Sequence, residues 1–248
     1  MHHKPSIAKL AGATVTALAL LVTTLPVRAQ DHDHGSAAAA ALYAVAESGG
    51  HAQSPINIVT AAVEAGRHAI ALHYRPSGEH IVNVGHTIEA DFDPGSSVEY
   101  DGATYELKQM HFHTPAEHLV DGITYPMELH MVHTLADHPD RYLVVGILFR
   151  EGEADPVVAE ILEHAPAESG ARYDAPAQLD AAELLPRVRH YYHYEGSLTT
   201  PPYSETVSWL VMKEIHEASP SQIERLNRLE GNNARHIQEL HGRRVDGR

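Results

Sequence analysis

One stretch limits what this chain can fold into: the alternating run from Tyr105 to His113, which ends in a His-x-His pair. Successive side chains of a β-strand point to opposite faces. The alternation therefore predicts a strand with one face made of Tyr105, Leu107, Gln109, His111 and His113. Two imidazoles spaced about 7 Å apart along such a strand can converge on one ion. The fold must then contain a sheet that carries a polar site on one face.

A second stretch, residues 126–133, supplies a third candidate ligand. It also reads as a strand, with Glu128, His130 and Val132 on one face, and the Asp121-Gly122 turn before it permits antiparallel pairing with the first strand. Three nitrogen ligands and an open fourth position are typical of catalytic zinc.

The residues two positions before two of the histidines support a metal site at His111, His113 and His130. Gln109 and Glu128 share a strand face with the histidine that follows, where each can hold the ring nitrogen that does not bind metal. The alternative is that the pair arises by chance or serves a solvated face, because the chain has 21 histidines.

Size and charge restrict the rest of the molecule. A chain of 248 residues with 43% hydrophobic content can form one domain with a substantial core. The formal net charge of −15 argues against nucleic acid or an anionic membrane surface as a partner. There is no cysteine, so histidine, carboxylates or water must hold any metal.

The N-terminus has the pattern of an export signal. Lys4 and Lys9 precede an uncharged apolar run over residues 10–27, and Ala29 offers a small residue before a cleavage site. We therefore expect a signal peptide over residues 1–29 and a periplasmic or secreted protein that is free of the membrane after cleavage. The alternative is an uncleaved anchor, because the apolar run is near the minimum length that spans a bilayer.

Residues 30–50 are expected to form a tail or a short helix, and the run Asp31-His-Asp-His34 within it a solvated tag. Beyond residue 50, turn signals separate short alternating runs. Helices are expected at 155–164 and, after a capping box, at 219–229, whereas 166–180 is expected to be irregular. The expected strands cover 69–74, 87–92, 105–113, 126–133, 142–149, 189–194 and 206–213. This pattern predicts a single, mostly β domain with short helices and a largely antiparallel sheet.

Five spaced motifs point to a family. The chain carries, in this order, Gln53-Ser-Pro-Ile, Asn83-Val-Gly-His86, Gln109 through His118, Glu128 through His133, and Gly196-Ser-Leu-Thr-Thr-Pro-Pro202. With Trp209, Lys213 and Asn233-Ala-Arg235, they closely resemble the α-class carbonic anhydrases in their bacterial exported form. The resemblance covers about residues 51–244. It implies a catalytic domain over 51–248, built on a central twisted sheet with a conical active-site cleft.

The resemblance also implies an activity, a cofactor and roles for particular residues. The chain would be a zinc lyase that reversibly hydrates carbon dioxide to bicarbonate and a proton through zinc-bound hydroxide. Its small-molecule partners would be carbon dioxide and bicarbonate, and the family is compatible with a homodimer. The implied Zn²⁺ ligands are His111, His113 and His130, supported by Gln109, by the backbone carbonyl of Asn233 and by Glu128, respectively.

Four further roles follow from the resemblance. The hydroxyl of Thr199 would accept a hydrogen bond from the hydroxide and donate its own proton to Glu117, which orients the nucleophile. His86 matches the proton shuttle. The wall that receives carbon dioxide would consist of Val132, Val144, Leu198, Val207 and Trp209, with Thr200 beside it.

Elementary chemistry agrees with this assignment. Carbon dioxide needs a nucleophile stronger than neutral water, and zinc lowers the pKa of its water, an effect for which carbonic anhydrase is the standard example. Carbon dioxide is small and nonpolar, so an apolar wall suffices to place it. A histidine, with an ordinary pKa near 6.5, can pass the released proton to buffer.

The sequence departs from the family in three places. Trp209 is the only tryptophan, so the usual aromatic N-terminal segment is missing. Val84 stands where the family often has a second asparagine, which puts the water chain toward His86 in doubt. The disulfide common in bacterial members is absent, and Tyr203 occupies its second position.

Alternatives remain at this stage. Glu117 could be a surface acid, Thr199 and Thr200 turn formers, and His86 a surface residue. A cupin-type oxygenase would use Glu117 as a direct ligand to iron or manganese, and a zinc-storing protein would bind several ions without turnover. Metal content and a hydration assay distinguish the three.

Overall fold

The computed structural model describes residues 50–185 and 190–248. The expected signal peptide and almost all of the expected tail therefore lie outside the described residues. Within them, no helix is long and apolar enough to cross a membrane.

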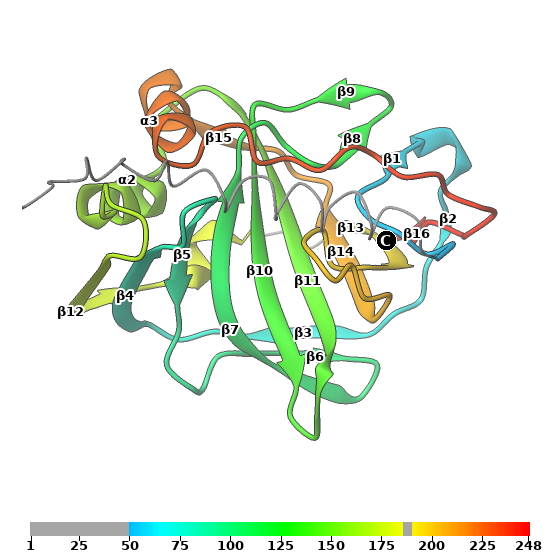
Figure 1. Cartoon of the computed structure of the whole chain (residues 1–248). Coiled ribbons are helices and arrows are strands. Elements are labelled where there is room, and N and C mark those ends of the chain that lie inside the picture. Colours follow the sequence, from blue (N-terminus) through cyan, green and yellow to red (C-terminus); the bar gives the residue numbers. More distant parts are fainter. Residues whose placement is uncertain (1–49, 186–189) are drawn as a thin grey trace, which may run out of the picture.

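The described residues form one large twisted sheet, one small sheet and two short α-helices, α2 (Pro156–His164) and α3 (Pro220–Glu230) (Figure 1). The central path of the large sheet is β12 (Arg172–Leu179), β4 (Ser77–Asn83), β5 (Ile88–Asp91), β7 (Ala103–His113), β10 (Met127–Leu135), β11 (His138–Glu151), β14 (Val207–Met212), β13 (Tyr191–Gly196), β16 (Asp246–Gly247) and β2 (Glu64–Ala65).

Three more strands pair beside this path: β3 (Ile70–His73), β6 (Ser97–Tyr100) and β15 (His216–Ala218). The small sheet consists of β1 (Asn57–Ile58), β8 (Leu119–Val120) and β9 (Ile123–Thr124), and 3₁₀ turns cover Thr60–Ala62 and Ala181–Leu184. Most neighbours in the large sheet are antiparallel, while β11 is parallel to β14 and β15. The prediction of a mostly β domain with a largely antiparallel sheet is confirmed.

Two apolar clusters pack on the sheet. The larger contains α2, through Val158 and Ile161, and α3, through Leu226, packed with residues of the central strands. The smaller surrounds Trp209 and Tyr194. Side chains of one strand alternate between the two clusters, which is why neighbouring residues can serve the core and the site separately.

Both predicted helices form, and their ends follow the sequence signals. Asp155 caps α2 by accepting a hydrogen bond from the backbone N–H of Val158 at 2.9 Å. Ser219 and Gln222 form the expected capping box of α3, and Gly231 ends that helix with a φ of +70°, which glycine adopts readily. Capping residues therefore located these helices to within a residue or two.

The prediction that Tyr105, Leu107 and the histidines share one face of β7 was wrong. In the pairing with β10, Gln109 lies opposite Val132 but Leu107 lies opposite His133, so Lys108 is an extra residue on β7. Such a β-bulge reverses the alternation. Tyr105 and Leu107 consequently point into the larger core cluster, on the face opposite the histidines.

The prediction that residues 166–180 are irregular was also wrong. Arg172–Leu179 forms β12 and pairs with β4, with an interruption between Ala175 and Gln178. Pro176 falls at this interruption, and a proline within a run weakens the strand signal because it cannot donate a ladder hydrogen bond.

Candidate active site

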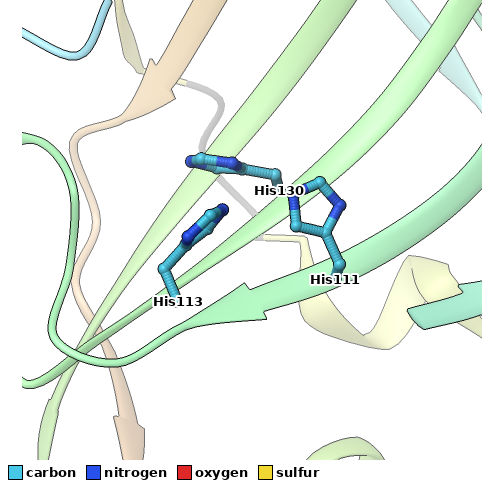
Figure 2. Close-up of side chains that lie close together, drawn as sticks. All are labelled: His111, His113 and His130. Atoms are coloured by element: carbon cyan, nitrogen blue, oxygen red, sulfur yellow. The ribbon is translucent and has the colours of Figure 1, made fainter. Parts of the chain in front are cut away.

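Three histidines meet where β7 and β10 pair. His111 and His113 come from the end of β7, and His130 lies directly opposite His111 on β10. Figure 2 shows the three rings turned toward one another from these two strands. One nitrogen of each ring lies within 4.8 Å of the others, and the ring centroids of His113 and His130 are 4.5 Å apart. The structure thus brings together the residues that the sequence proposed as a ligand set.

The predicted neighbours hold two of these rings. Nδ1 of His111 donates to Oε1 of Gln109 at 2.8 Å, and Nε2 of His130 donates to Oε1 of Glu128 at 2.9 Å. These bonds leave Nε2 of His111 and Nδ1 of His130 as the nitrogens available to a metal ion. A hydrogen bond on the far nitrogen fixes the ring and its tautomer, as in metal sites generally.

His113 differs from the other two. Its side chain is buried, and neither ring nitrogen has a hydrogen bond of ordinary geometry. The backbone of Asn233 nevertheless lies close enough to favour the charged form of the ring. Burial is the stronger effect, and it lowers the pKa of both His113 and His111 well below the usual range. Both rings are therefore neutral, which is the form that binds a metal.

Glu128 anchors the back of the site. Its Oε2 accepts hydrogen bonds from the backbone N–H groups of Glu117 and His118 at 2.9 and 2.8 Å, and its Oε1 also accepts from the His118 ring at 2.7 Å. Burial alone raises the pKa of Glu128, but the adjacent rings of His118 and His130 lower it well below its usual range. A permanent carboxylate therefore lies behind His130.

Glu117 lies between the histidines and Arg235. Its Oε1 accepts the backbone N–H of Arg235 at 2.8 Å, and its two oxygens are 3.7 and 4.0 Å from Nδ1 of His113 and of His130, respectively. Burial raises the pKa of Glu117 to about 8, while the N–H of Arg235 and the hydroxyl of Thr199 act in the opposite direction. Oε2 has no hydrogen bond of ordinary geometry, so Thr199 is near this carboxyl group but not fully engaged with it.

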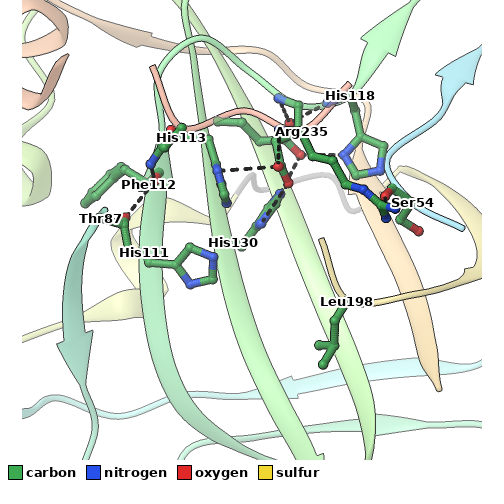
Figure 3. Close-up of polar contacts among 12 residues, drawn as sticks. Ser54, Thr87, His111, Phe112, His113, His118, His130, Leu198 and Arg235 are labelled. Atoms are coloured by element: carbon green, nitrogen blue, oxygen red, sulfur yellow. Dashed lines mark hydrogen bonds and ion pairs between the residues drawn. The ribbon is translucent and has the colours of Figure 1, made fainter. Parts of the chain in front are cut away.

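Arg235 connects this centre to the start of the domain. Its guanidinium donates to the backbone carbonyl of Ser54 at 2.7 Å and to Oε1 of Gln53 at 2.9 Å. Figure 3 shows the polar contacts around Arg235, His118 and Ser54 beside the three histidines. Gln53 in turn donates to the carbonyl of Tyr203 at 3.1 Å, and the Arg235 guanidinium stacks on the Tyr203 ring at 3.7 Å.

A cavity of about 450 Å³ opens onto the histidines. Its lining includes His111, His113, Thr199, Thr200 and His86. His86 is exposed at the turn between β4 and β5, and it is near enough to lower the pKa of His111 by charge repulsion.

The residues predicted to receive carbon dioxide also assemble. Val144, Val207 and Trp209 are buried in the smaller core cluster, and Val132 and Leu198 are partly buried against it. Val144 pairs with Val132 on one side and with Trp209 on the other, so the sheet register makes this patch continuous.

Sequence reasoning missed two carboxyl groups that line the cavity. Glu89 lies opposite His111 in the β5–β7 pairing, and burial raises its pKa to about 7. Glu230, at the end of α3, accepts hydrogen bonds from Thr87 and from the backbone N–H of Ile88. The alternation of residues 87–92 contains the signal for Glu89, but finding Glu230 requires the tertiary position of α3.

A single, mostly β domain thus brings three imidazoles together in its twisted sheet, and two of them, His111 and His113, line an open cavity. This arrangement is typical of the class of enzymes that bind a metal ion through histidine. Within it, the family model described as eukaryotic-type carbonic anhydrase matches residues 38–248. The chain belongs to the carbonic anhydrase family, and it is an enzyme for the hydration of carbon dioxide. The cupin and zinc-storage alternatives are thereby excluded.

Individual relatives agree with the family assignment. The carbonic anhydrase of Neisseria gonorrhoeae is 39% identical over 200 residues, which cover 80% of this chain and 78% of that protein. The carbonic anhydrase of Nostoc sp. is 36% identical over 201 residues, covering 79% and 75%. Among solved structures, the α-carbonic anhydrase from Thermovibrio ammonificans, in complex with the inhibitor sulfanilamide, superposes with a TM-score of 0.76 at 39% identity and covers 79% of this chain and 87% of that one.

Proposed function

We propose that this carbonic anhydrase is zinc-dependent and holds its catalytic zinc on His111, His113 and His130. The observation that supports the proposal is which of their ring nitrogens have hydrogen-bond partners. The far nitrogens of His111 and His130 are engaged by Gln109 and Glu128, and His113 has two buried nitrogens without a hydrogen bond. Buried polar atoms without partners are costly, and a cation at the common centre would satisfy one nitrogen of His113, while the backbone of Asn233 lies near the ring. Three imidazoles within 4.8 Å suit zinc in number and chemistry.

Zinc bound there would lower the pKa of a coordinated water, so that attack on carbon dioxide can occur near neutral pH. The residues of the chain then orient the reaction. With Glu117 ionised, the Thr199 hydroxyl would donate to it and could then only accept from the attacking water, which would fix the direction of the nucleophile. The backbone N–H of Arg235 holds Glu117 in place for this role.

Substrate placement falls to the apolar patch made of Val132, Val144, Leu198, Val207 and Trp209, with Thr200 on the cavity wall. The patch excludes water from the side on which carbon dioxide must approach. Carbon dioxide carries no net charge, so the shape of the patch and the exclusion of water suffice to place it.

Proton release falls to His86. His86 lines the cavity and is exposed to solvent. A ring nitrogen can therefore accept a proton from water in the cavity and transfer it to buffer. Val84, in the same turn, offers no polar group to order that water.

We also propose that residues 1–29 are a cleaved signal peptide and that the catalytic domain spans 51–248. The support is the charged start, the apolar run and Ala29. The mature enzyme would work in the periplasm or outside the cell.

A stopped-flow carbon dioxide hydration assay combined with zinc analysis tests the metal assignment. His130→Ala should lose one zinc ion per chain and most of the activity while keeping native circular dichroism. His138→Ala, an exposed histidine at the start of β11, is the matched control and should keep both. An unchanged zinc content in His130→Ala would refute the ligand set.

A further inference from the structure

A second histidine cluster lies on the opposite face of the sheet from the catalytic centre. It comprises His68, just before β3, His193 on β13 and Asp246 on β16. Tyr194, the next residue on β13, packs in the cluster around Trp209 on the active-site face. Because strand residues alternate, His193 points away from that face. The cluster is therefore independent of the carbon dioxide site.

The distances within this cluster are those of a ligand set. Oδ2 of Asp246 lies 3.5 Å from Nε2 of His68 and 3.4 Å from Nδ1 of His193. A tetrahedral zinc with bonds of 2.0–2.1 Å keeps its ligand atoms about 3.3 Å apart. Two edges of the ligand triangle thus already have the right length, and all three ligand atoms lie within 4.8 Å of one another.

The far nitrogens of both rings are engaged, as in a metal site. Nδ1 of His68 contacts Oδ2 of Asp101 at 2.6 Å. Nε2 of His193 contacts Oε1 of Glu195 at 3.3 Å. The hydroxyl of Tyr100 lies 2.9 Å from each of these two nitrogens. A carboxylate behind each imidazole orients the ring and increases its basicity as a ligand.

Charge also favours a cation. Each ring turns its other nitrogen toward the same oxygen of Asp246. In the tautomers that donate to Asp101 and Glu195, these two nitrogens carry lone pairs, which a cation can accept. Oδ1 of Asp246 is buried and has no hydrogen bond. Three carboxylates around two imidazoles form a strongly negative, partly buried group, and His193 is 92% buried as a side chain, since its side-chain exposure is 8%. Protons on the rings or a bound cation would offset this negative charge.

We propose that His68, His193 and Asp246 form a second, structural site for a divalent transition-metal ion, with Zn²⁺ as its occupant. An N₂O set of imidazoles and a carboxylate suits zinc. The site would join β16, near the end of the sequence, to β13 and to the segment before β3. These parts are far apart in sequence, so a metal link between them restricts the unfolded chain in the way a disulfide would, and this chain has no cysteine.

Zinc counting tests the proposal on the full chain. After equilibration with Zn²⁺ and removal of free metal, the wild type should hold one zinc more than Asp246→Asn, whose side chain keeps its volume but loses its charge. Carbon dioxide hydration by Asp246→Asn should stay at the wild-type rate. His73→Ala, an exposed histidine on β3 outside the cluster, is the matched control and should bind as much zinc as the wild type. The N-terminal histidines are the same in every variant, so they do not affect the differences. Equal zinc content in the wild type and Asp246→Asn would overturn the proposal.

A second measurement guards against a variant that merely unfolds. In the His130→Ala background, which removes a catalytic ligand, Zn²⁺ should raise the midpoint of thermal unfolding by several degrees relative to chelator. That rise should disappear in the double variant His130→Ala/Asp246→Asn. If zinc leaves the midpoint of His130→Ala unchanged, the cluster is a proton-linked imidazole–carboxylate network and the metal site is refuted.

Discussion

At the scale of single residues, the proposed role of the pair Thr199 and Glu117 is to orient the nucleophile. Thr199→Ala removes the hydroxyl but no metal ligand, and Glu117→Gln lets the amide donate to Thr199 and reverse the bond. Each change should lower turnover by roughly 10²-fold, the scale of losing one oriented polar contact in a transition state. Hydration kinetics with zinc analysis measures both effects.

The control for this pair is the metal content. Both variants should retain the catalytic zinc. Wild-type turnover in either variant would contradict the orienting role, and loss of zinc from Glu117→Gln alone would instead make this carboxylate a ligand.

The role proposed for His86 concerns a different step, proton release. His86→Ala should lower kcat in dilute buffer and leave kcat/KM nearly unchanged, because proton release follows the hydration steps that kcat/KM reports. Imidazole buffer should restore much of the loss, since it replaces the missing base. Because Val84 offers no polar group, the wild type itself is expected to respond to buffer. Equal losses in kcat and kcat/KM would mean that His86 supports the fold or the metal site.

Contacts between side chains could be predicted from the sequence where the spacing along one strand determines them. The pairs Gln109–His111 and Glu128–His130 are two residues apart on regular strands, so their hydrogen bonds follow from alternation. Glu89 was missed because it approaches His111 from β5, and no local pattern states which strands will be neighbours.

At the scale of elements, α3 places its last residue at the wall of the cavity. Glu230 is its last residue, and it accepts hydrogen bonds from Thr114 on one oxygen and from Thr87 on the other. Burial raises its pKa to about 8, from an ordinary value near 4.5. Between these two values the folded chain binds a proton that the unfolded chain releases, so this group makes the folded state less stable as the pH rises.

Glu230→Gln should remove that dependence. The free energy of unfolding of the wild type, relative to the variant, should fall between pH 5 and pH 8, by at most about 1.4 kcal/mol per pH unit. Urea unfolding across this range measures it. Glu224→Gln, an exposed substitution on the same helix, is the control and should show no such trend. A difference that grows with pH instead would contradict the sign.

Elements that carry a local sequence signal, such as capping residues or alternation, were predicted well. Elements whose strand character depends on pairing with another strand were not. Capping residues located α2 and α3, and alternation located β7 and β10. β12 was not predicted, because its strand character depends on pairing with β4 around Pro176. Gln53, Tyr203 and Arg235 connect the start of the domain to the loop after Pro202 through hydrogen bonds and stacking.

At the scale of the whole molecule, the prediction concerns processing. Intact-mass measurement of the protein from the periplasm or medium should give a chain that begins at Gln30. Cleavage removes Lys4, Lys9 and Arg28 and no acidic residue, so the formal charge changes from −15 to −15 − 3 = −18. A secreted or periplasmic chain that still begins at Met1 would contradict the signal peptide.

The extra residue at Lys108 has a consequence for how this protein can change over generations. Its side chain is exposed and pairs with Glu106 on the same strand, so a substitution there should have little effect on stability. A deletion should have a larger effect, because it would restore simple alternation and turn either Leu107 out of the core or His111 into it. This surface position should thus tolerate a substitution but not a deletion. Mutant libraries that contain substitutions but no deletions would therefore not reveal that the length of β7 is constrained.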